Sequence, residues 1–258
     1  MNVLESFRLH GKVALVTGGA GILGKSIVEG LAEAGATVIS ASRNVATGLQ
    51  LQEDFAKRGL EIHLLQYDQS DHESIVGLRQ KIKSDFGGLD IFVNNAVARP
   101  MKGYDGSIDQ IEESMQINGT GNIDILREMA ALIDERGGGS IINISSMMGM
   151  FGPDLSNYEG TDMGTPPPDY YFHKGGLITL SKYFAKVLAG KNIRVNTISP
   201  GGIFFHQPER FLENYCKKVP LRRLADAADI KGVIVLLSSD AGAYINGINI
   251  LLDGGLLA

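Results

Sequence analysis

Residues 12–36 read KVALVTGGAGILGKSIVEGLAEAGA. The first six form a short apolar run rich in β-branched side chains, which is typical of a strand buried on both faces. Glycines follow at once, and from Ile22 the apolar residues recur at helical spacing. A strand, a glycine-rich turn and a helix in this order form an anion site, because glycine lets the backbone come close and free N–H groups at the helix N-terminus face a phosphate. The stretch therefore predicts nucleotide binding, with a purely structural turn as the alternative.

Length and composition bound the class of protein. The chain has 258 residues, 44% of them hydrophobic, with no internal repeat and no linker-like stretch, so we expect a single domain over residues 1–258. Charges of both signs are interspersed at a net charge of −5, which argues against a nucleic-acid surface. The one cysteine, Cys216, excludes an internal disulfide, offers no zinc-like spacing and suits a reducing compartment. The first residues, MNVLESFRLHGK, predict neither a signal peptide nor a membrane span, so the cytoplasm is the expected location.

Apolar runs and helical periodicity alternate along the rest of the chain. Further strands are expected near residues 36–40, 61–68, 89–96, 140–146, 192–199 and 246–255. Helices are expected over 45–58 and 110–136, from Tyr170 onward, and over 229–240. Together with residues 12–17, this alternation predicts an α/β fold in which a doubly wound, seven-stranded parallel sheet carries helices on both faces.

The residues after the second expected strand bear on the cofactor. A fold of this kind that prefers NAD usually ends this strand with an Asp or Glu bonded to the ribose 2′-OH, whereas a nearby Arg accommodates the 2′-phosphate of NADP. Here the chain reads Ser42, Arg43 and Asn44, with no acid. Ser42 can donate to a phosphate oxygen, and Arg43 can pair with it or stack on adenine. The sequence therefore predicts NADP(H), with NAD(H) as the second choice. The alternative is that Arg43 is an ordinary solvent-exposed side chain with no cofactor role.

Polar residues also end three other expected strands, and strand C-termini line the ligand crevice of an open parallel sheet. Asp68 and Gln69 follow the third strand, where Asp68 either binds the adenine amino group or caps the next helix. Asn94 and Asn95 follow the fourth, where their amides can tie strands together or reach the cofactor. The second of two serines, Ser146, ends the fifth.

The expected helix over 110–136 contains Asn118, which is followed by Gly119 and Gly121. Each glycine inside a helix costs about 1 kcal/mol relative to alanine. We therefore expect another group to approach the backbone closely at this point.

Tyr170 and Lys174 occupy positions i and i+4 of an expected helix. Such positions lie one above the other on the same face, so the phenol and the ammonium can point into one site. A free phenol titrates near pH ~10, and a neighbouring cation favours the phenolate, which brings the group closer to acid/base work near neutrality. Tyr and Lys also meet at this spacing by chance, so the interpretation depends on its context.

Two segments are expected to border the substrate. The loop 147–169 holds three consecutive prolines and scattered acids, and loops of this length are usually functional or disordered. Its polar residues suggest hydrogen bonds to substrate hydroxyls, and residues 201–222 form a segment that can close over a ligand as a lid. Candidate partners for a substrate carboxylate, or else ordinary surface side chains, are Arg99, His173, His206 and Arg210.

Along essentially its whole length the chain resembles the short-chain dehydrogenase/reductase family. The matching motifs, in order, are TGGAGILG from Thr17, NNA from Asn94, Asn118, ISS from Ile144, YYFHK from Tyr170, SPGGI from Ser199 and LLDGG from Leu251. The resemblance implies a single-domain Rossmann fold and reversible hydride transfer between a nicotinamide cofactor and a carbonyl/alcohol pair. Among members, the sequence looks closest to those that act on sugars or sugar acids, such as gluconate/ketogluconate 5-reductases.

The resemblance also implies roles for particular residues. Ser146 would orient the carbonyl, Tyr170 would be the general acid/base, Lys174 would hold the nicotinamide ribose and lower the phenol pKa, and Asn118 would support a proton-relay water. A wider set is expected on the cofactor: Gly18, Gly21, Ile22, Leu23, Gly24, Asp68, Gln69, Asn95, Pro200 and the backbone around Ile203. The family usually assembles as dimers or tetramers through the helix with Asn118 and the helix starting at Tyr170.

The chain departs from the family pattern in three places. The family commonly has Gly where Ile22 stands, which alters the expected pyrophosphate contacts. Val97 replaces the usual Gly after NNA and narrows the space beside the nicotinamide. Tyr170 follows Ser146 by 24 residues, about twice the usual separation, so the loop 147–169 carries an insertion that should shape specificity without changing the chemistry.

These observations predict an NADP(H)-dependent oxidoreductase of a polar sugar, sugar acid or polyol, without nucleic-acid or membrane partners, that assembles as a homotetramer or homodimer. One alternative is an NAD-dependent dehydrogenase of a steroid-like or acyl substrate, against which the polar loop argues. The other is a catalytically silent dinucleotide-binding module, against which the set Asn118, Ser146, Tyr170 and Lys174 argues.

Overall fold

The structure is a computed structural model that describes residues 2–258. Seven strands form one sheet in which every neighbouring pair is parallel, in the order β3-β2-β1-β4-β5-β6-β7. The strands are β1 (Val13–Thr17), β2 (Thr37–Ser42), β3 (Ile62–Gln66), β4 (Ile91–Asn94), β5 (Gly139–Ile144), β6 (Ile193–Pro200) and β7 (Asn249–Leu252). The predicted doubly wound α/β fold is confirmed, and each strand lies within or close to its predicted range.

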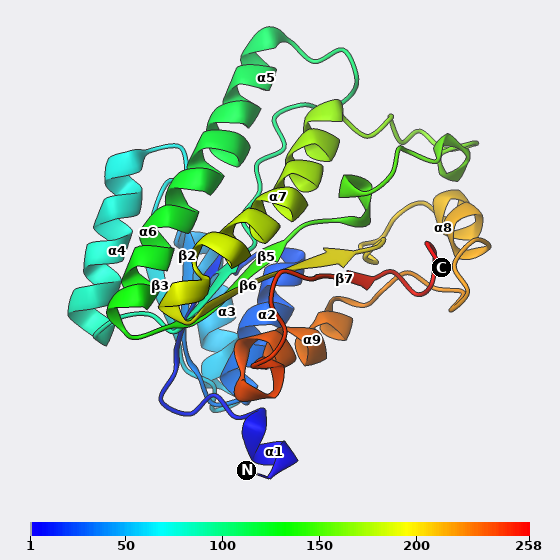
Figure 1. Cartoon of the computed structure of the whole chain (residues 1–258). Coiled ribbons are helices and arrows are strands. Elements are labelled where there is room, and N and C mark those ends of the chain that lie inside the picture. Colours follow the sequence, from blue (N-terminus) through cyan, green and yellow to red (C-terminus); the bar gives the residue numbers. More distant parts are fainter. Residues whose placement is uncertain (1) are drawn as a thin grey trace.

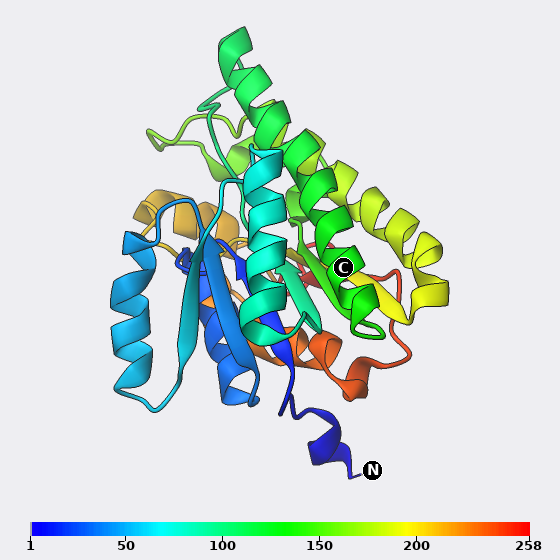
Figure 2. The same cartoon turned by 90° about the vertical axis from the view of Figure 1, so that its left-hand side faces the viewer.

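Helices cover both faces of the sheet (Figure 1), as the turned view also shows (Figure 2). One face carries α2 (Ile22–Glu33), α3 (Ala46–Ala56) and α9 (Lys231–Ser238), and the other carries α4 (His72–Phe86), α6 (Gly121–Glu135) and α7 (Pro168–Val187). Short helices are α1 (Val3–Ser6), α5 (Ile108–Ser114) and α8 (Glu209–Cys216), with 3₁₀ turns at Met147–Gly149, Leu155–Asn157, Ala189–Lys191, Ala227–Ile230 and Asp240–Gly242. Within residues 2–258, none of these helices combines the length and apolar character that crossing a bilayer would require.

The alternation of side chains along each strand explains the two layers. In β1, Leu15 and Val16 are both fully buried, but Leu15 packs under α4, α6 and α7, whereas Val16 packs under α2, α3 and α9. Strands buried on both faces need apolar residues at every position, which is why β1 reads as a continuous apolar run.

The strand order fixes where a ligand can bind. From β1 the chain moves outward through β2 to β3 and then returns to β4 on the other side of β1. The connections after β1 and β4 therefore leave in opposite directions, and a crevice opens at the carboxyl ends of these strands. The polar residues predicted at strand ends all come from this edge of the sheet.

A third, smaller apolar cluster lies outside the two main layers. Its buried members are Met147, Phe211, Tyr215, Val219 and Leu224, and partly buried side chains from the insertion and the C-terminal tail, such as Phe151, Tyr158 and Leu256, pack against them. The cluster joins the loop 147–169, α8 and the chain end. In Figure 1 these segments lie together to the right of α7.

The predicted helix over 110–136 is wrong in one respect, because it is not a regular α-helix throughout. Residues Met115–Thr120 form a π-helical turn, η1, between α5 and α6. A Cβ added at Gly121 would lie 2.1 Å from the Gln69 carbonyl oxygen, so the expected close approach occurs there. It does not occur at Gly119, where the nearest atom, His173 Cε1, would be 3.8 Å away. Wide helical turns of this kind are frequent at functional sites.

Candidate active site

The glycine turn after β1 forms a cradle for an anion. Gly18 has φ +64°, a conformation that favours glycine. A Cβ added at Gly24 would lie 2.2 Å from the Gly18 carbonyl oxygen, so no side chain fits there. Gly21 begins α2 without a side-chain cap, which leaves the N–H groups of Ile22 and Leu23 facing outward at the positive end of the helix. This backbone fits the diphosphate of a dinucleotide, with the Ile22 side chain exposed at its edge.

The end of β2 presents a free cation. Arg43 is exposed and forms no ion pair with any described residue. Ser42 and Asn44 are instead used locally: Ser42 Oγ donates to the Asn44 carbonyl at 3.0 Å, and Asn44 Oδ1 accepts from the Ala46 N–H at 3.0 Å at the start of α3. No carboxylate takes the position after β2 that would favour a ribose 2′-OH.

Asp68 follows β3, and its suggested role as helix cap is wrong. Asp71 caps α4, because its carboxylate accepts from the Glu73 N–H. The Asp68 carboxylate accepts from the Ser70 N–H and Oγ, at 2.9 and 2.7 Å, and these bonds together with the charge of Arg43 lower its pKa. Asp68 is thus a rigidly held carboxylate at the crevice edge.

Gln69 lies in the interior. It is buried, its Oε1 accepts from the Tyr67 hydroxyl at 3.0 Å, and its Nε2 donates to the Ile117 carbonyl and to Asn122 Oδ1. The Gln69 amide is therefore occupied inside the protein, and a cofactor contact would use the backbone at this position.

The two asparagines after β4 tie neighbouring elements together. Asn94 Nδ2 donates to Asn143 Oδ1 on β5 at 2.9 Å and to Asn122 Oδ1 on α6 at 3.1 Å. Asn95 Nδ2 donates to the carbonyls of Thr17 and Gly18, at 2.9 and 3.1 Å, and so holds the glycine turn. Both asparagines thereby fix the geometry of the crevice wall.

Asn118 lies in η1 and faces inward. Its amide bonds the backbone of Ala98 in both directions, accepting from the N–H and donating to the carbonyl at 2.9 Å each, and it also donates to Ser114 Oγ at 3.2 Å. The Asn118 carbonyl accepts from Asn122 Nδ2 at 2.6 Å. Asn118 thus connects the helix to the segment after β4.

Lys174 is joined to the end of β5. Its Nζ donates to the Ile144 carbonyl at 2.7 Å, and its own carbonyl accepts from Ser145 Oγ at 2.7 Å. Ser146 is the next residue; it is buried, and its Oγ accepts from the Met148 N–H at 3.1 Å while its hydrogen remains free to donate. Complete burial lowers the pKa of Lys174 to about 7, and the charge of Arg99 adds to the effect.

The Tyr170 ring lies near two cations. The Lys174 Nζ is 5.5 Å from the ring centroid, and the Arg99 guanidinium carbon is 4.6 Å from it. Contacts of this length are cation–π interactions. No carboxylate lies within ion-pair distance of Arg99 in the described chain. The structure therefore brings Tyr170, Lys174 and Arg99 together, and Ser145, the residue before Ser146, bonds the Lys174 carbonyl.

The two candidate histidines lie in different environments. His173 is buried, and its Nε2 is 3.1 Å from Ser114 Oγ. His206 is exposed in the segment 201–222, has φ +54°, and its ring contacts those of Phe204 and Phe205. Arg210, on α8, pairs with Glu213 at 3.1 Å. Among the described residues, Arg99 alone of the four candidate partners for a substrate carboxylate forms a cation–π contact with the Tyr170 ring.

In the segment after β6, the Ile203 backbone donor is available. Pro200 ends β6, and the bridge between Ile203 and Ala225 uses the Gly202 carbonyl and the Phe204 N–H. The Ile203 N–H has no partner among residues 2–258, while its carbonyl accepts from Gln207 Nε2 at 2.7 Å.

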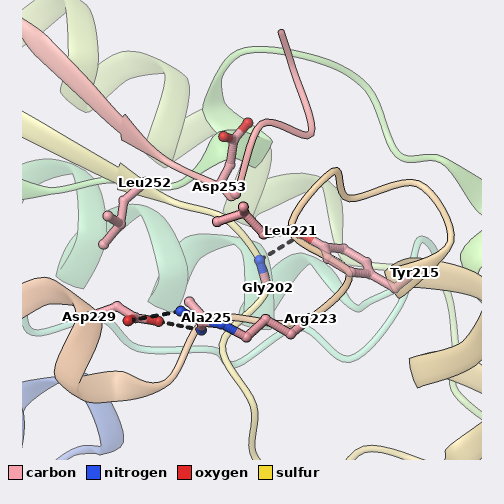
Figure 3. A pocket seen from close by; sticks show the side chains of 9 residues that line it. Gly202, Tyr215, Leu221, Arg223, Ala225, Asp229, Leu252 and Asp253 are labelled. Atoms are coloured by element: carbon pink, nitrogen blue, oxygen red, sulfur yellow. Dashed lines mark hydrogen bonds and ion pairs between the residues drawn. The ribbon is translucent and has the colours of Figure 1, made fainter.

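A cavity of about 190 Å³ lies beside this segment (Figure 3). Arg223 pairs with Asp229 at 2.5 Å, and the Asp253 carboxylate accepts from the N–H groups of Gly255 and Leu257. The Tyr215 hydroxyl accepts from the Gly202 N–H at 2.7 Å. The lining comes from the segment 201–222, Asp229 and the end of β7.

Three polar side chains of the insertion bond within the protein. Asp154, Ser156 and Asn157 all bind the ammonium of Lys218, at 2.5, 2.6 and 2.7 Å, so their polar atoms are occupied by the segment 201–222. Lys218 and Ser114 were not identified from the sequence, since a lysine near a helix end and a serine inside a helix carry no distinguishing pattern.

A second cavity, of about 310 Å³, lies between the insertion, α7 and the C-terminal tail. Its lining is largely apolar and includes Met147, Met148, Phe151, Tyr158 and Leu256. The Tyr171 hydroxyl is buried without a hydrogen-bond partner in the described chain, and burial raises the pKa of this phenol to about 12. Two residues that line the cavity, Met147 and Tyr171, directly follow Ser146 and Tyr170 in the sequence.

No group of three or more His, Cys, Asp or Glu side chains in the described residues has the geometry of a metal site.

Comparison with known proteins identifies the family. The sequence model of the family described as Enoyl-(Acyl carrier protein) reductase matches residues 18–257. The chain belongs to the short-chain dehydrogenase/reductase family. Members of this family are oxidoreductases that act on alcohol or carbonyl groups with NAD or NADP, so the protein is an enzyme of this class.

Individual relatives of this dehydrogenase/reductase cover its whole length. It is 32% identical to a 2-dehydro-3-deoxy-D-gluconate 5-dehydrogenase from Pseudoalteromonas atlantica, over 98% of both chains. A gluconate 5-dehydrogenase from Burkholderia cenocepacia, solved with NADP and tartrate, superposes with a TM-score of 0.87 at 26% identity over 99% of this chain and 98% of that one. A short-chain dehydrogenase from Leptospira borgpetersenii with bound NAD+ gives a TM-score of 0.86 at 29% identity, over 100% and 96%.

Proposed function

We propose that the protein interconverts a carbonyl and a secondary alcohol with NADP(H), on a polar substrate that carries a carboxylate, such as a sugar acid. The observation that carries the proposal is the position of the Tyr170 ring beside Lys174 and Arg99, next to Ser146. Lys174 can stabilise the ionised form of the Tyr170 phenol. Arg99, which lacks a carboxylate partner in the described chain, can pair with an anionic substrate.

Side chains of the protein act as general acid and base and stabilise the charges that develop during the reaction. When bound, the nicotinamide supplies or accepts the hydride. Tyr170 donates its phenolic proton to the oxygen that gains charge during reduction and takes a proton from the alcohol during oxidation, while Ser146 Oγ donates a hydrogen bond to the same oxygen. Lys174 stabilises the phenolate between these steps. Asn118 holds the segment after β4 against η1 and supports the proton path.

The proposed preference for NADP(H) rests on Arg43, an exposed cation without an ion pair at the end of β2. Asp68, Asn95 and the free Ile203 N–H would hold the adenine and nicotinamide ends. Titration of NADPH and NADH fluorescence on the purified protein tests the preference, with Arg43→Asp alongside. We expect NADPH to bind more tightly and the variant to lose at least about tenfold in NADPH affinity, because it removes a charge-assisted pair and adds repulsion. Equal or better NADH binding by the parent protein would overturn the preference.

The proposed substrate class rests on Arg99. Its replacement by Gln should lower kcat/KM for a sugar acid such as 5-ketogluconate by about 10- to 100-fold, since a charged hydrogen bond contributes roughly 1.5–3 kcal/mol. A neutral polyol such as mannitol should be affected much less. Equal losses on both substrates would assign Arg99 to the phenol rather than to the substrate.

The apolar cavity of about 310 Å³ favours a second candidate, a 3-oxoacyl or related acyl substrate. An acyl chain would fill the space between Met148, Phe151 and Tyr158. Turnover of acetoacetyl thioesters with kcat/KM above that for every sugar acid tested would favour this candidate.

We further propose that the enzyme is one domain, with residues 147–169 as the substrate-side insertion and residues 201–222 as a lid. Exposed apolar side chains on η1, α6 and α7 support a homodimer or homotetramer through these helices: Met115, Ile123, Phe172, Tyr183 and Val187. The single free cysteine supports a cytoplasmic location. Light scattering on the purified protein tests the assembly.

A further inference from the structure

A buried polar cluster lies behind the Tyr170–Lys174 pair. Asp169 and His173 come from α7, Ser114 ends α5 and Asn118 lies in η1; all four side chains are buried. Ser114 Oγ is the common partner, at 2.5 Å from Asp169 Oδ2, 3.1 Å from His173 Nε2 and 3.2 Å from Asn118 Nδ2. We call these residues the Ser114 cluster.

The hydrogen-bond inventory assigns the protons of the cluster. Ser114 Oγ has one hydrogen and two lone pairs. An ionised Asp169 can only accept, so the hydroxyl hydrogen points to Oδ2, and both lone pairs then face N–H groups. Asn118 Nδ2 supplies one of these groups, and His173 must supply the other from Nε2. Burial lowers the pKa of His173, with Lys174 adding to the effect and Asp169 opposing it, which leaves a neutral ring protonated on Nε2.

Each member of the cluster is joined to a residue of the proposed site. Asp169 Oδ1 accepts from the Tyr170 N–H at 2.8 Å, at the first turn of α7. His173 directly precedes Lys174 in the same helix. Asn118 uses its remaining amide atoms on the Ala98 backbone, one residue before Arg99. The cluster therefore connects the three segments that carry Tyr170 with Lys174, Asn118 and Arg99.

We propose that His173 is a positioning residue for the hydride-transfer reaction, a role that rests on the proposed function. Its Nε2–H donates to Ser114 Oγ, turns the Ser114 hydrogen toward Asp169 and leaves the second lone pair for Asn118. Without this donor, the Ser114 hydroxyl can rotate. Asn118 in η1 then loses its fixed partner at the end of α5. The consequence is a less fixed register between η1 and α7, which matters because displacements near 1 Å can cost about 100-fold in rate.

Two substitutions separate this role from simple packing. His173→Gln keeps an N–H donor at about the reach of Nε2, whereas His173→Leu fills similar space without a donor. In ¹⁵N-resolved NMR spectra of the NADP⁺-bound enzyme, the parent imidazole should be the Nε2–H tautomer. The Asn118 side-chain amide should keep its resonances in the Gln variant and shift or broaden in the Leu variant. An Nδ1–H tautomer, or Asn118 resonances unchanged in the Leu variant, would overturn the proposal.

Kinetics give a second readout. The Leu variant should lose about tenfold in kcat with NADPH affinity unchanged, and the Gln variant should stay within about twofold of the parent. A Gln variant as slow as the Leu variant would show that shape, rather than the donor, matters and would overturn the proposal. The NMR experiment needs no substrate, so absence of turnover in the parent would count against the proposed function alone and leave the test of His173 intact.

Discussion

The glycine turn after β1 and the insertion after Ser146 both follow the carboxyl ends of strands, but they are held in different ways. The turn is fixed by backbone: Gly18 and Gly24 touch at distances that exclude side chains, and Asn95 bonds two of its carbonyls. The insertion is fixed by side chains, through Lys218 and a separate apolar cluster that is independent of the sheet layers.

We relate this difference to the two proposed roles, cofactor binding at the glycine turn and substrate selection at the insertion. A dinucleotide diphosphate is the same in every relative, and backbone N–H groups at a helix start bind it at fixed distances. A substrate wall made of side chains can change without disturbing the sheet. Changes at the cofactor side and at Tyr170 should therefore act on the chemistry, and changes at the insertion should act on substrate selection.

The largest effect is expected from Tyr170→Phe. It removes the proposed general acid, and such a loss typically costs about 10²- to 10⁴-fold in rate. NADPH affinity should stay close to that of the parent, because the ring and its contact with Lys174 remain. Stopped-flow measurement of NADPH oxidation with substrate checks the rate, and fluorescence titration checks the binding.

The neighbouring Tyr171→Phe is the matched control for this prediction. Its hydroxyl is buried without a partner in the described chain, so its removal should leave the hydride-transfer rate within about twofold. If Tyr170→Phe turned over as fast as the parent, Tyr170 would not be the acid, and the silent-module alternative would regain support.

The second effect concerns stability and pH. The pKa of Lys174 is about 7 in the folded protein and near the ordinary 10.5 in an unfolded chain. Between these values the unfolded chain binds more protons, so the contribution of Lys174 makes the free energy of unfolding rise with pH from about 7 to 10.5. Lys174→Met should remove this rise, measured as urea midpoints at pH 7, 8 and 9.

Lys182→Met, an exposed lysine on the same helix, is the control and should keep the pH dependence of the parent. A Lys174→Met profile parallel to the parent's would mean that the ammonium is better solvated than its complete burial implies.

The smallest effect is expected from Lys218→Met, which releases the insertion from the segment 201–222. Partly exposed ion pairs contribute about 0–1 kcal/mol, so we expect about a threefold rise in substrate KM and little loss of stability. NADPH affinity should not change. Lys217→Met is the control, and a Lys218→Met variant that weakened NADPH binding as much as substrate binding would contradict the division between the two regions.

Most of the sheet and the glycine turn before α2 could be predicted from the sequence, because strands buried on two faces and a glycine turn before a helix leave strong local patterns. The register of buried polar side chains could not. The six-residue π turn around Asn118 and the close approach of Gly121 to the Gln69 carbonyl that follows it are encoded by no local pattern. Asp68 is a candidate cap for α4 in the sequence, but the structure places Asp71 at that position.

The insertion shows the limit most clearly. Its polar residues predicted contacts with substrate hydroxyls, but Asp154 and Asn157 are used by Lys218, a residue more than sixty positions away along the chain. Asp169, counted with them, belongs to the Ser114 cluster. Side-chain pairs between distant segments leave no trace in composition or periodicity. The sequence therefore predicted a polar surface on the insertion from residues whose polar atoms bond other parts of the protein.

The separate apolar cluster under the insertion also bears on how the protein opens. Because Met147, Phe211, Tyr215, Val219 and Leu224 pack mainly with one another, this part can unfold locally while the two sheet layers stay closed. Amide hydrogens of α8 and the insertion should then exchange with solvent together, and faster than those of β1 and β4. The segments proposed to border the substrate would then open without the sheet.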